Sequence, residues 1–372
     1  MGKYSSWKFV YIILSILLIN ISIASAEVVS EISVFGGYTS NLFFDSSRLN
    51  DSYSSINPNF KYYPSSTVEL SLSGSYTAYS KYSDLSNFSG LAGISLIPLD
   101  ESLPYSLIIS GQVFNRLYGD YYDSYDNYGL KTSILGIYRI KPTFHARTGG
   151  SLYTTDYNNA TSGDYDGFDL FAGLNTTLPG NNSLNLESGY NYRKYQNYSS
   201  NNTSGNGNQN FDIDSKFNVI YLSARISRPL GPKTGLSINY TESSFIGNND
   251  PIVYGFSIDY LTPWASLWDG RSVTVKLKNF SIPNVILEGG VQYTQKYFVA
   301  MLEESATEED YILTNRDDKR ANLFLNIEIP FTTGKGKLIK PSILIEYLDN
   351  SSNLDLYDYS YLNLSAGINF RL

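Results

Sequence analysis

The sequence predicts an all-β protein: a closed antiparallel transmembrane β-barrel of about 16 strands (14 to 18), preceded by a cleaved signal peptide. Three observations predict this fold. Segments of about ten residues alternate between apolar and polar side chains along the chain after residue 26, and a period of two is that of a strand. Short turns alternate with long polar loops. No run of 18 apolar residues follows the leader, so strands rather than helices would cross a membrane.

Composition excludes several classes of function. The 372-residue chain has no Cys, one His, 15% aromatic residues and a formal net charge of −8. Without Cys there is no disulfide scaffold, iron–sulfur cluster or thiol nucleophile, and a single His leaves no His-rich metal site. The excess of acidic residues argues against nucleic acid as a partner, since phosphate binding needs a basic surface. The 34 Tyr residues suit membrane interfaces, where amphipathic rings accumulate.

Residues 1–26 have the pattern of a secretory signal peptide. Lys3 and Lys8 precede an apolar segment that runs from Phe9 to Ile23. Ala24-Ser25-Ala26 then forms a small-residue cleavage site. The chain therefore divides into a signal peptide, 1–26, and one outer-membrane β-barrel domain, 27–372. An uncleaved membrane anchor is the alternative, although the apolar segment is short for a helix that spans a bilayer.

Strand positions follow from the alternation, taken in chain order. Near the N-terminus, Val68, Leu70 and Leu72 share one face of a strand, and Glu69 and Ser71 share the other. The same pattern predicts strands near 29–40, 54–63, 67–80, 88–97, 105–116, 128–139, 143–155, 167–178, 183–195, 217–228, 234–243, 252–262, 318–330, 338–348 and 359–372.

The segment from 271 to 298 is ambiguous. Ser281-Ile282-Pro283-Asn284 looks like a turn, yet a split at this point gives an odd number of strands and leaves the two chain ends on opposite sides. We therefore expect one long, interrupted strand here, and 16 strands in total.

Connections of two lengths alternate along the chain. The short ones contain Pro, Gly or Lys, at 64–66, 141–142, 179–182, 229–233 and 332–337. The long ones are rich in Asn, Asp, Ser and Tyr, at 41–53, 117–127, 156–166, 196–215 and 298–317. In outer-membrane barrels short turns face the periplasm and long loops face outward. The sequence predicts this orientation, with outer-membrane lipid around the barrel.

The barrel is expected to be closed. An open sheet in lipid would leave N–H and C=O groups of its edge strands unpaired, at several kcal/mol each, so the first strand (29–40) must pair with the last (359–372). The last strand ends in apolar and aromatic residues, with Phe370 two places before the C-terminus; we expect barrel-assembly machinery to recognise this strand. A secreted β-sandwich or adhesin, whose apolar faces would meet in a core, is the alternative.

Two segments look like the opening and closing hairpins of a known group of proteins. They are Gly37-Tyr38-Thr39-Ser40-Asn41-Leu42-Phe43 followed by Ile56-Asn57-Pro58, and Glu346-Tyr347-Leu348-Asp349-Asn350-Ser351-Ser352-Asn353 followed by Tyr357-Asp358-Tyr359. In these the chain resembles the broad group of outer-membrane β-barrel porins of Gram-negative bacteria. Barrels of surface-lipoprotein assembly modifiers and of exopolysaccharide-cluster proteins have similar hairpins. The resemblance implies a fold and a location, and it implies no functional residues.

A barrel of 16 to 18 strands encloses an aqueous channel. The position of the apolar faces assigns 14 cations to the channel wall: Lys61, Lys81, Arg116, Lys131, Arg139, Arg147, Arg193, Arg225, Lys276, Lys278, Lys296, Arg320, Lys340 and Arg371. Eight acids share that face: Glu31, Glu69, Asp169, Glu187, Asp259, Glu288, Glu328 and Glu346. The sequence thus predicts a weakly anion-preferring wall below an acidic outer vestibule. The alternative is that these charges pair across strands and only solvate the lumen.

No arrangement of residues predicts an enzyme or a cofactor. His145, the only imidazole, is expected near the periplasmic end of a strand as a polar lumen residue. Asp120, Asp123 and Asp126 recur every three residues and could ligate Ca²⁺. They lack a Gly-turned loop of known pattern, so a solvated loop is the simpler interpretation.

The sequence therefore predicts a porin-like channel of the outer membrane for passive diffusion of small hydrophilic solutes. Two alternatives stay open. One is a barrel component of an export conduit for polysaccharide, lipoprotein or electron transfer, with its lumen open or occupied by another chain. The other is a surface-adhesion barrel that binds through loops 196–215 and 298–317. A diffusion porin should instead fold a loop inward to constrict the pore. The solute, and whether the chain forms a homo-oligomer, are not determined by the sequence.

Overall fold

Nearly all of the described chain is antiparallel β-structure. The computed structural model describes residues 27–97, 103–158, 164–195, 216–246, 253–254, 268–304, 311–334 and 336–371. The predicted signal peptide, 1–26, lies outside these ranges. No helix in the described ranges is long and apolar enough to span a bilayer.

Sixteen strands form the barrel wall. They are β1 (Glu27–Thr39), β2 (Asp51–Ser65), β3 (Val68–Tyr79), β4 (Asn87–Leu96), β5 (Tyr105–Tyr118), β6 (Asn127–Lys141), β7 (Phe144–Tyr157), β8 (Tyr165–Leu178), β9 (Asn182–Tyr195), β10 (Lys216–Gly231), β11 (Thr234–Phe245), β13 (Asp269–Asn279), β14 (Ile286–Glu304), β15 (Tyr311–Glu328), β17 (Leu338–Ser352) and β18 (Tyr359–Arg371). Two strands of two residues, β12 (Val253–Tyr254) and β16 (Phe331–Thr332), pair with β14 and β17.

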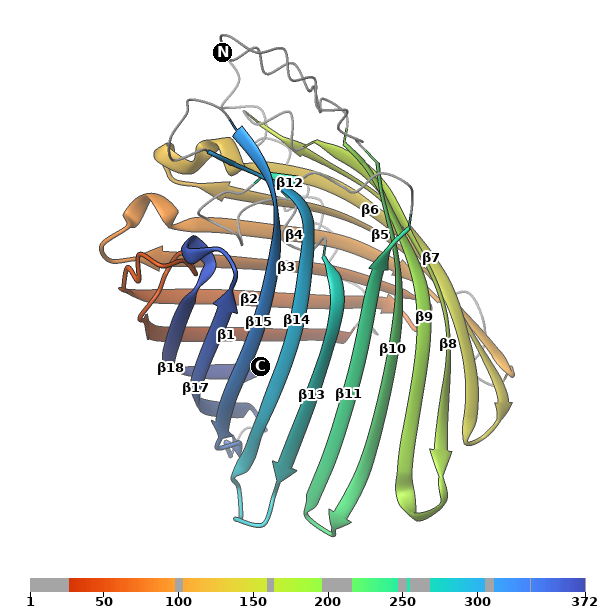
Figure 1. The fold of residues 1–372 in the computed structure, drawn as a ribbon. Coiled ribbons are helices and arrows are strands. Elements are labelled where there is room, and N and C mark those ends of the chain that lie inside the picture. The colour runs from red at the N-terminus through yellow and green to blue at the C-terminus, as the bar shows by residue number, and fades with distance from the viewer. Residues whose placement is uncertain are drawn as a thin grey trace.

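The first and last strands close the barrel (Figure 1). β1 pairs antiparallel with β2 along one edge and with β18 along the other, in a register that runs from Glu31 opposite Arg371 to Thr39 opposite Asn363. Every barrel strand therefore has a neighbour on both edges, and no open edge meets lipid. The prediction of a closed antiparallel barrel of 16 strands is confirmed.

Two of the predicted strand boundaries are wrong, and the errors cancel in the count. β11 pairs with β10 and with β13, so both of its edges are occupied. The strand expected at 252–262 therefore does not join the ring; only Val253–Tyr254 of it is described, paired parallel with β14. The chain does turn at 280–285, where Val285 donates its N–H to the carbonyl oxygen of Ile282 at 3.1 Å and Asn284 has a φ of 57°. The single strand expected over 271–298 is thus two strands, β13 and β14.

The prediction of a long loop at 298–317 is also wrong. β14 continues to Glu304 and β15 begins at Tyr311, with these two residues opposite each other. A register shift between Phe298 and Met301 interrupts the pairing without ending it. The residues between the two strands, 305–310, lie outside the described ranges.

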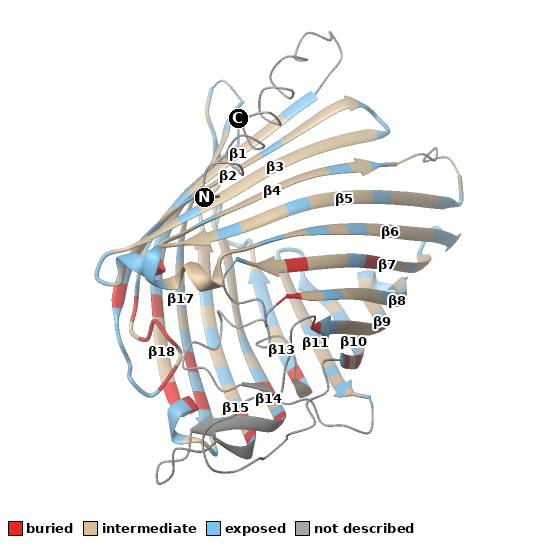
Figure 2. Cartoon of the chain, turned by 90° about the horizontal axis from the view of Figure 1, so that it is seen from above, coloured by how far each residue is buried: buried red, intermediate tan, exposed pale blue. Residues whose placement is uncertain are grey.

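The connections are sorted to the two ends of the barrel. We call the end with the connections 66–67, 142–143 and 232–233 the turn rim, and the end with 40–50, 80–86 and 119–126 the loop rim. Short 3₁₀ turns, η1 (Ser83–Leu85), η2 (Asp120–Tyr125) and η5 (Asp355–Tyr357), lie at the loop rim, and η4 (Pro179–Asn181) lies at the turn rim. Most fully buried residues gather towards the loop rim (Figure 2). The periplasmic orientation of the turn rim stays a prediction.

The outer face of the barrel is apolar. Each barrel strand exposes at least one large apolar side chain on one face, among them Val34, Ile56, Tyr76, Ile94, Ile109, Ile134, Leu152, Leu170, Leu186, Leu222, Ile238, Leu277, Val291, Leu323, Ile343 and Leu364. In a sandwich these side chains would be buried in a core, whereas here they form a continuous exposed belt. A soluble monomer rarely exposes such a surface. The belt is the lipid-facing surface of a transmembrane barrel, and the β-sandwich alternative is wrong.

A pair of neighbouring residues on β6 tests this assignment of faces. Ile134 is 49% exposed on the outer face, and Ser133 lies on the opposite face, where its Oγ is 2.5 Å from Oγ of Ser110. We expect Ile134→Lys to lower the free energy of unfolding in lipid by about 2–4 kcal/mol, the cost of a cation near the bilayer midplane. Ser133→Lys, the matched control, should cost less than half as much. Urea titration in phospholipid vesicles measures both, and equal costs would contradict the assignment.

Candidate functional site: the inner wall and the loop rim

The inner wall consists of the side chains that alternate with the exposed apolar ones. On β10, for example, Ile220 and Leu222 are exposed on the outer face, while Tyr221 lies on the inner face and donates a hydrogen bond to Glu187 at 2.9 Å. Two interior cavities are lined by such positions. One of about 710 Å³ lies against β1–β3, β14, β15, β17 and β18. The other, of about 480 Å³, lies against β11, β13, β14, β15 and β17, nearer the loop rim.

The structure places the predicted wall cations as follows. On strands, opposite the exposed apolar side chains, lie Lys61, Arg116, Lys131, Arg139, Arg147, Arg193, Arg225, Lys276, Lys278, Lys296, Arg320, Lys340 and Arg371. Lys81 differs, because β3 ends at Tyr79 and Lys81 is an exposed residue of the loop-rim connection. Its backbone N–H donates to Asp51 Oδ1 at 3.0 Å. Asp259 lies outside the described ranges.

Carboxylates on the adjacent strand, or on the strand beyond it for Lys131 and Arg147, hold several of these cations. The ion pairs are Lys61–Glu69 at 2.9 Å, Lys131–Asp169 at 4.0 Å, Arg147–Glu187 at 2.6 Å, Lys276–Glu288 and Lys278–Glu288 at 3.5 Å, and Arg371–Glu31 at 3.7 Å. Cross-strand pairing, which the sequence left open, thus involves six wall cations in the described part of the chain. Arg225 and Lys340 form no ion pair with a described residue.

Charge is unevenly distributed around the wall. Among the described inner-face side chains of β5–β10 there are six cations and two acids: Arg116, Lys131, Arg139, Arg147, Arg193 and Arg225 against Asp169 and Glu187. The remaining strands carry eight cations and eight acids: Lys61, Lys276, Lys278, Lys296, Arg316, Arg320, Lys340 and Arg371 against Glu27, Glu31, Asp51, Glu69, Glu288, Asp318, Glu328 and Glu346. We call the inner face of β5–β10 the basic arc; it holds all four of the excess positive charges of the described wall.

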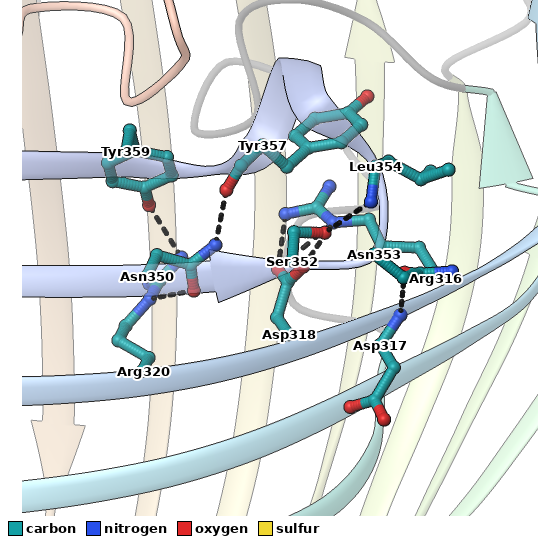
Figure 3. Close-up of polar contacts among 10 residues, drawn as sticks. All are labelled: Arg316, Asp317, Asp318, Arg320, Asn350, Ser352, Asn353, Leu354, Tyr357 and Tyr359. Carbon is teal, nitrogen blue, oxygen red and sulfur yellow. Dashed lines mark hydrogen bonds and ion pairs between the residues drawn. The ribbon is translucent and has the colours of Figure 1, made fainter.

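A buried ion pair lies on β15 close to the loop rim (Figure 3). Arg316 Nε is 2.9 Å from both carboxylate oxygens of Asp318, and the two side chains are 1% and 0% exposed. The guanidinium carbon of Arg316 lies 3.5 Å from the ring centre of Tyr357 and 4.7 Å from that of Phe298. The charge is therefore neutralised by a carboxylate and packed against two rings, which makes burial tolerable.

Hydrogen bonds around this ion pair attach the β17–β18 connection to β15 and β17 (Figure 3). Asp317 donates its N–H to Asn353 Oδ1 at 2.7 Å, and Asn353 Nδ2 donates to the carbonyl oxygen of Asn315 at 2.8 Å. Asn350 Nδ2 donates to the carbonyl oxygen of Tyr357 at 2.6 Å. One step along β15, Arg320 Nη2 donates to the hydroxyl oxygen of Tyr359 at 2.7 Å.

Sequence reasoning missed Arg316 because it placed 298–317 in a loop. It also left Asp318 out of the wall acids, although Asp318 is the first residue of the strand predicted at 318–330. The signal was present in the sequence: Arg316, Asp318 and Arg320 have the parity of one strand face. Once β15 begins at Tyr311, that parity puts all three on the inner wall.

Aromatic side chains fill the loop rim on two sides. Tyr195, Phe217, Val219, Phe298 and Tyr357 belong to one buried cluster, with members from β9, β10, β14 and the β17–β18 connection. A second cluster joins three connections, with Leu42, Phe43 and Leu85 buried among the rings of Tyr79, Tyr82, Tyr118, Tyr122 and Tyr125. Burial raises the pKa of the loop residues Tyr122 and Tyr125 above the ordinary value of a tyrosine hydroxyl.

The residues considered for chemistry are not brought together. His145 is the second residue of β7, near the turn rim, opposite Arg139 and Asn175. Asp120 and Asp123 lie in η2, and Asp126 Oδ1 accepts the N–H of Tyr118 at 2.6 Å, which closes that connection. Within the described ranges no three His, Cys, Asp or Glu residues are arranged to hold a metal ion.

Comparisons with known proteins give structural neighbours only. No family model and no curated protein matches the chain. Among solved structures the chain is similar to Acinetobacter baumannii OccAB1 (TM-score 0.49, 10% identity, 94% of this chain and 97% of that chain). It is also similar to the Pseudomonas aeruginosa outer membrane protein opdK (TM-score 0.48, 11%, 93% and 98%) and to P. aeruginosa OpdQ (TM-score 0.45, 13%, 94% and 99%).

The location follows from the barrel itself. A closed antiparallel barrel with an apolar belt outside and a polar wall inside is the form in which strands cross the outer membrane. The chain is accordingly an integral outer-membrane β-barrel of porin-like architecture.

The buried pair on β15 should matter more for stability than an exposed pair. We expect Asp318→Ala to lower the free energy of unfolding by about 3–5 kcal/mol, because it leaves Arg316 buried without its carboxylate. Glu69→Ala removes the partner of Lys61, whose side chain is 39% exposed, and should cost less than about 1 kcal/mol. Denaturant titration in detergent micelles compares the two variants. Equal losses would show that the Arg316–Asp318 pair is not held as described.

Proposed function

We propose that the protein is a porin-like channel of the outer membrane through which small hydrophilic solutes diffuse passively. The observation that carries this proposal is the polar inner wall of a closed 16-strand barrel. A barrel of this size is wide enough to hold water, and its interior cavities of about 710 and 480 Å³ are lined by hydroxyl, amide and charged side chains. No catalysis and no cofactor is part of the proposal.

The basic arc supports a preference for anions. Exposed charges that line a narrow path raise the local concentration of the opposite ion. Arg225 supports this most directly, since it is exposed to the lumen and forms no ion pair with a described residue. The ion pairs elsewhere on the wall reduce the effect, so the preference is weak.

The β17–β18 connection is held at the loop rim. Tyr357 packs on Arg316 of the inner wall, and Asn350 and Asn353 hydrogen-bond to the carbonyl oxygens of Tyr357 and Asn315. The adhesion alternative relied on loops 196–215 and 298–317. The first lies outside the described ranges, and the second is largely a strand hairpin.

Liposome swelling tests the proposal. Vesicles that contain the protein should swell in isotonic solutions of small sugars, at rates that fall steeply with solute size, because passage is limited by pore width. Protein-free vesicles are the control. An absence of swelling by the smallest sugar, with protein that has the heat-modifiable mobility of a folded barrel, would contradict passive diffusion.

A matched pair of arginines on β10 tests the basic arc. Arg225 lies on the inner face and Arg228 on the outer face, and both are exposed. Arg225→Glu lowers the excess positive charge of the described wall from four to two, so we expect the reversal potential in asymmetric KCl to move towards cation preference. Arg228→Glu should leave it unchanged. A clearly cation-selective wild-type channel, or equal shifts from both variants, would overturn the assigned preference.

A further inference from the structure

Seven glycines on the inner wall lie directly opposite an aromatic residue of the adjacent strand. The pairs are Gly37–Tyr53, Gly129–Phe114, Gly149–Phe171, Gly167–Tyr153, Gly189–Tyr221, Gly290–Phe324 and Gly367–Phe35. A Cβ atom added at any of these glycines would fall closer than 3.0 Å to the opposing ring. Each ring therefore lies against the backbone of its glycine, in the space that a side chain would otherwise fill.

The arrangement gives the wall flat apolar facets. A ring that covers a glycine turns one face to the backbone and the other towards the lumen. Cations cover some of these outward faces: Lys131 Nζ lies 5.9 Å from the ring centre of Tyr153, the Arg147 guanidinium 6.0 Å from that of Phe171, and Lys276 Nζ 5.3 Å from that of Phe324. Among the described side chains no cation covers Phe35 or Tyr53.

Phe35 and Tyr53 both line the 710 Å³ cavity, together with Tyr79 and Phe324. Tyr53 and Tyr79 are cross-strand neighbours with ring centres 6.2 Å apart. Three of the seven glycine-backed rings thus meet at one cavity, opposite the basic arc. The volume is within the range of small-molecule sites.

Neutral hydrogen-bonding groups surround these rings. The cavity is also lined by Ser33, Ser55, Thr77, Ser342, Ser365, Asn326 and Asn369. Its charged residues are Glu288, Glu328 and Lys340, and Glu288 is paired with Lys276 and Lys278. The cavity lies on the strands whose described charges nearly balance, so it has no strong preference for an ion of either sign.

We propose that this cavity is a subsite for a neutral saccharide, whose C–H faces stack on Phe35 and Tyr53 while its hydroxyls exchange hydrogen bonds with the Ser, Thr and Asn side chains. The inference rests on the proposed channel function and deepens it. An apolar solute would leave the hydroxyls and amides unpaired. An anion would gain more from the basic arc across the lumen. A pyranose ring has both an apolar face and a rim of hydroxyls, and this combination matches rings set among hydroxyl and amide groups.

Ion current through single channels in planar bilayers tests the proposal with cellobiose and cellotriose as probes. Both sugars should reduce the wild-type current in a saturable, concentration-dependent way. Polyethylene glycol of matched hydrodynamic size, which has no pyranose faces, is the control and should reduce it only in proportion to concentration.

Matched variants assign the effect to the cavity. Phe35→Leu removes one bare ring face and should raise the half-blocking concentration about tenfold, the loss of one stacking contact. Gly367→Ala keeps the ring of Phe35 but crowds both that ring and the carbonyl oxygen of Val34; in channels that still conduct, it should weaken block in the same direction. Phe171→Leu, which removes a ring covered by Arg147 on the basic arc, should change block less than about twofold.

The outcomes separate this inference from the channel function. A channel that conducts ions but shows no saturable block by either sugar overturns the subsite and leaves the channel. Equal weakening by Phe35→Leu and Phe171→Leu also overturns it, because block would then not depend on this cavity. A folded barrel that carries no current overturns the proposed function, and this inference with it.

Discussion

The structure depends on one constraint: a backbone N–H or C=O group cannot be left unpaired in hydrocarbon. The chain satisfies it through the pairing of its two ends, where Glu31 to Thr39 of β1 lie opposite Arg371 to Asn363 of β18. This contact joins residues more than 320 positions apart, and it alone turns a long meander into a closed wall. Without it the hairpins between neighbouring strands would remain, but the two edges would be exposed to lipid.

Closure then gives each side of a strand a different solvent. The outer face meets lipid and carries exposed apolar residues such as Ile134 and Leu323. The inner face meets water. A charge on it is tolerated where water solvates it or where an opposite charge pairs with it, as Glu187 pairs with Arg147 and Asp318 with the buried Arg316. The wall is therefore a sum of local arrangements: a basic arc, a fastened connection at the loop rim, and a nearly balanced face with bare aromatic rings.

Local alternation was enough to predict most of this from the sequence. The strand order, the closed barrel and the face of Lys61 or Arg225 all follow from a period of two and from the cost of an open edge, whereas the count of 16 was reached through two errors that cancelled. The predictions that failed concerned where strands begin and end. The turn near Asn284 was visible in the sequence but was rejected because it gave an odd number of strands. Arg316 was missed because its segment, expected to be a loop, is part of β15. The glycine–aromatic pairs could not be predicted, because Gly367 lies opposite Phe35 in one register only. The sequence of either strand alone does not determine that register.

Oxidative cross-linking of the seam between β1 and β18 tests the central claim most directly. The chain has no Cys, so a pair introduced as Gly36→Cys and Ala366→Cys would be the only thiols, at positions directly opposite each other in the register. The account predicts an intramolecular disulfide in the folded protein in membranes, as readily as for Gly36→Cys with Ser54→Cys on the β1–β2 hairpin. If only the hairpin pair cross-links, the first and last strands are not neighbours, and the closed barrel is contradicted.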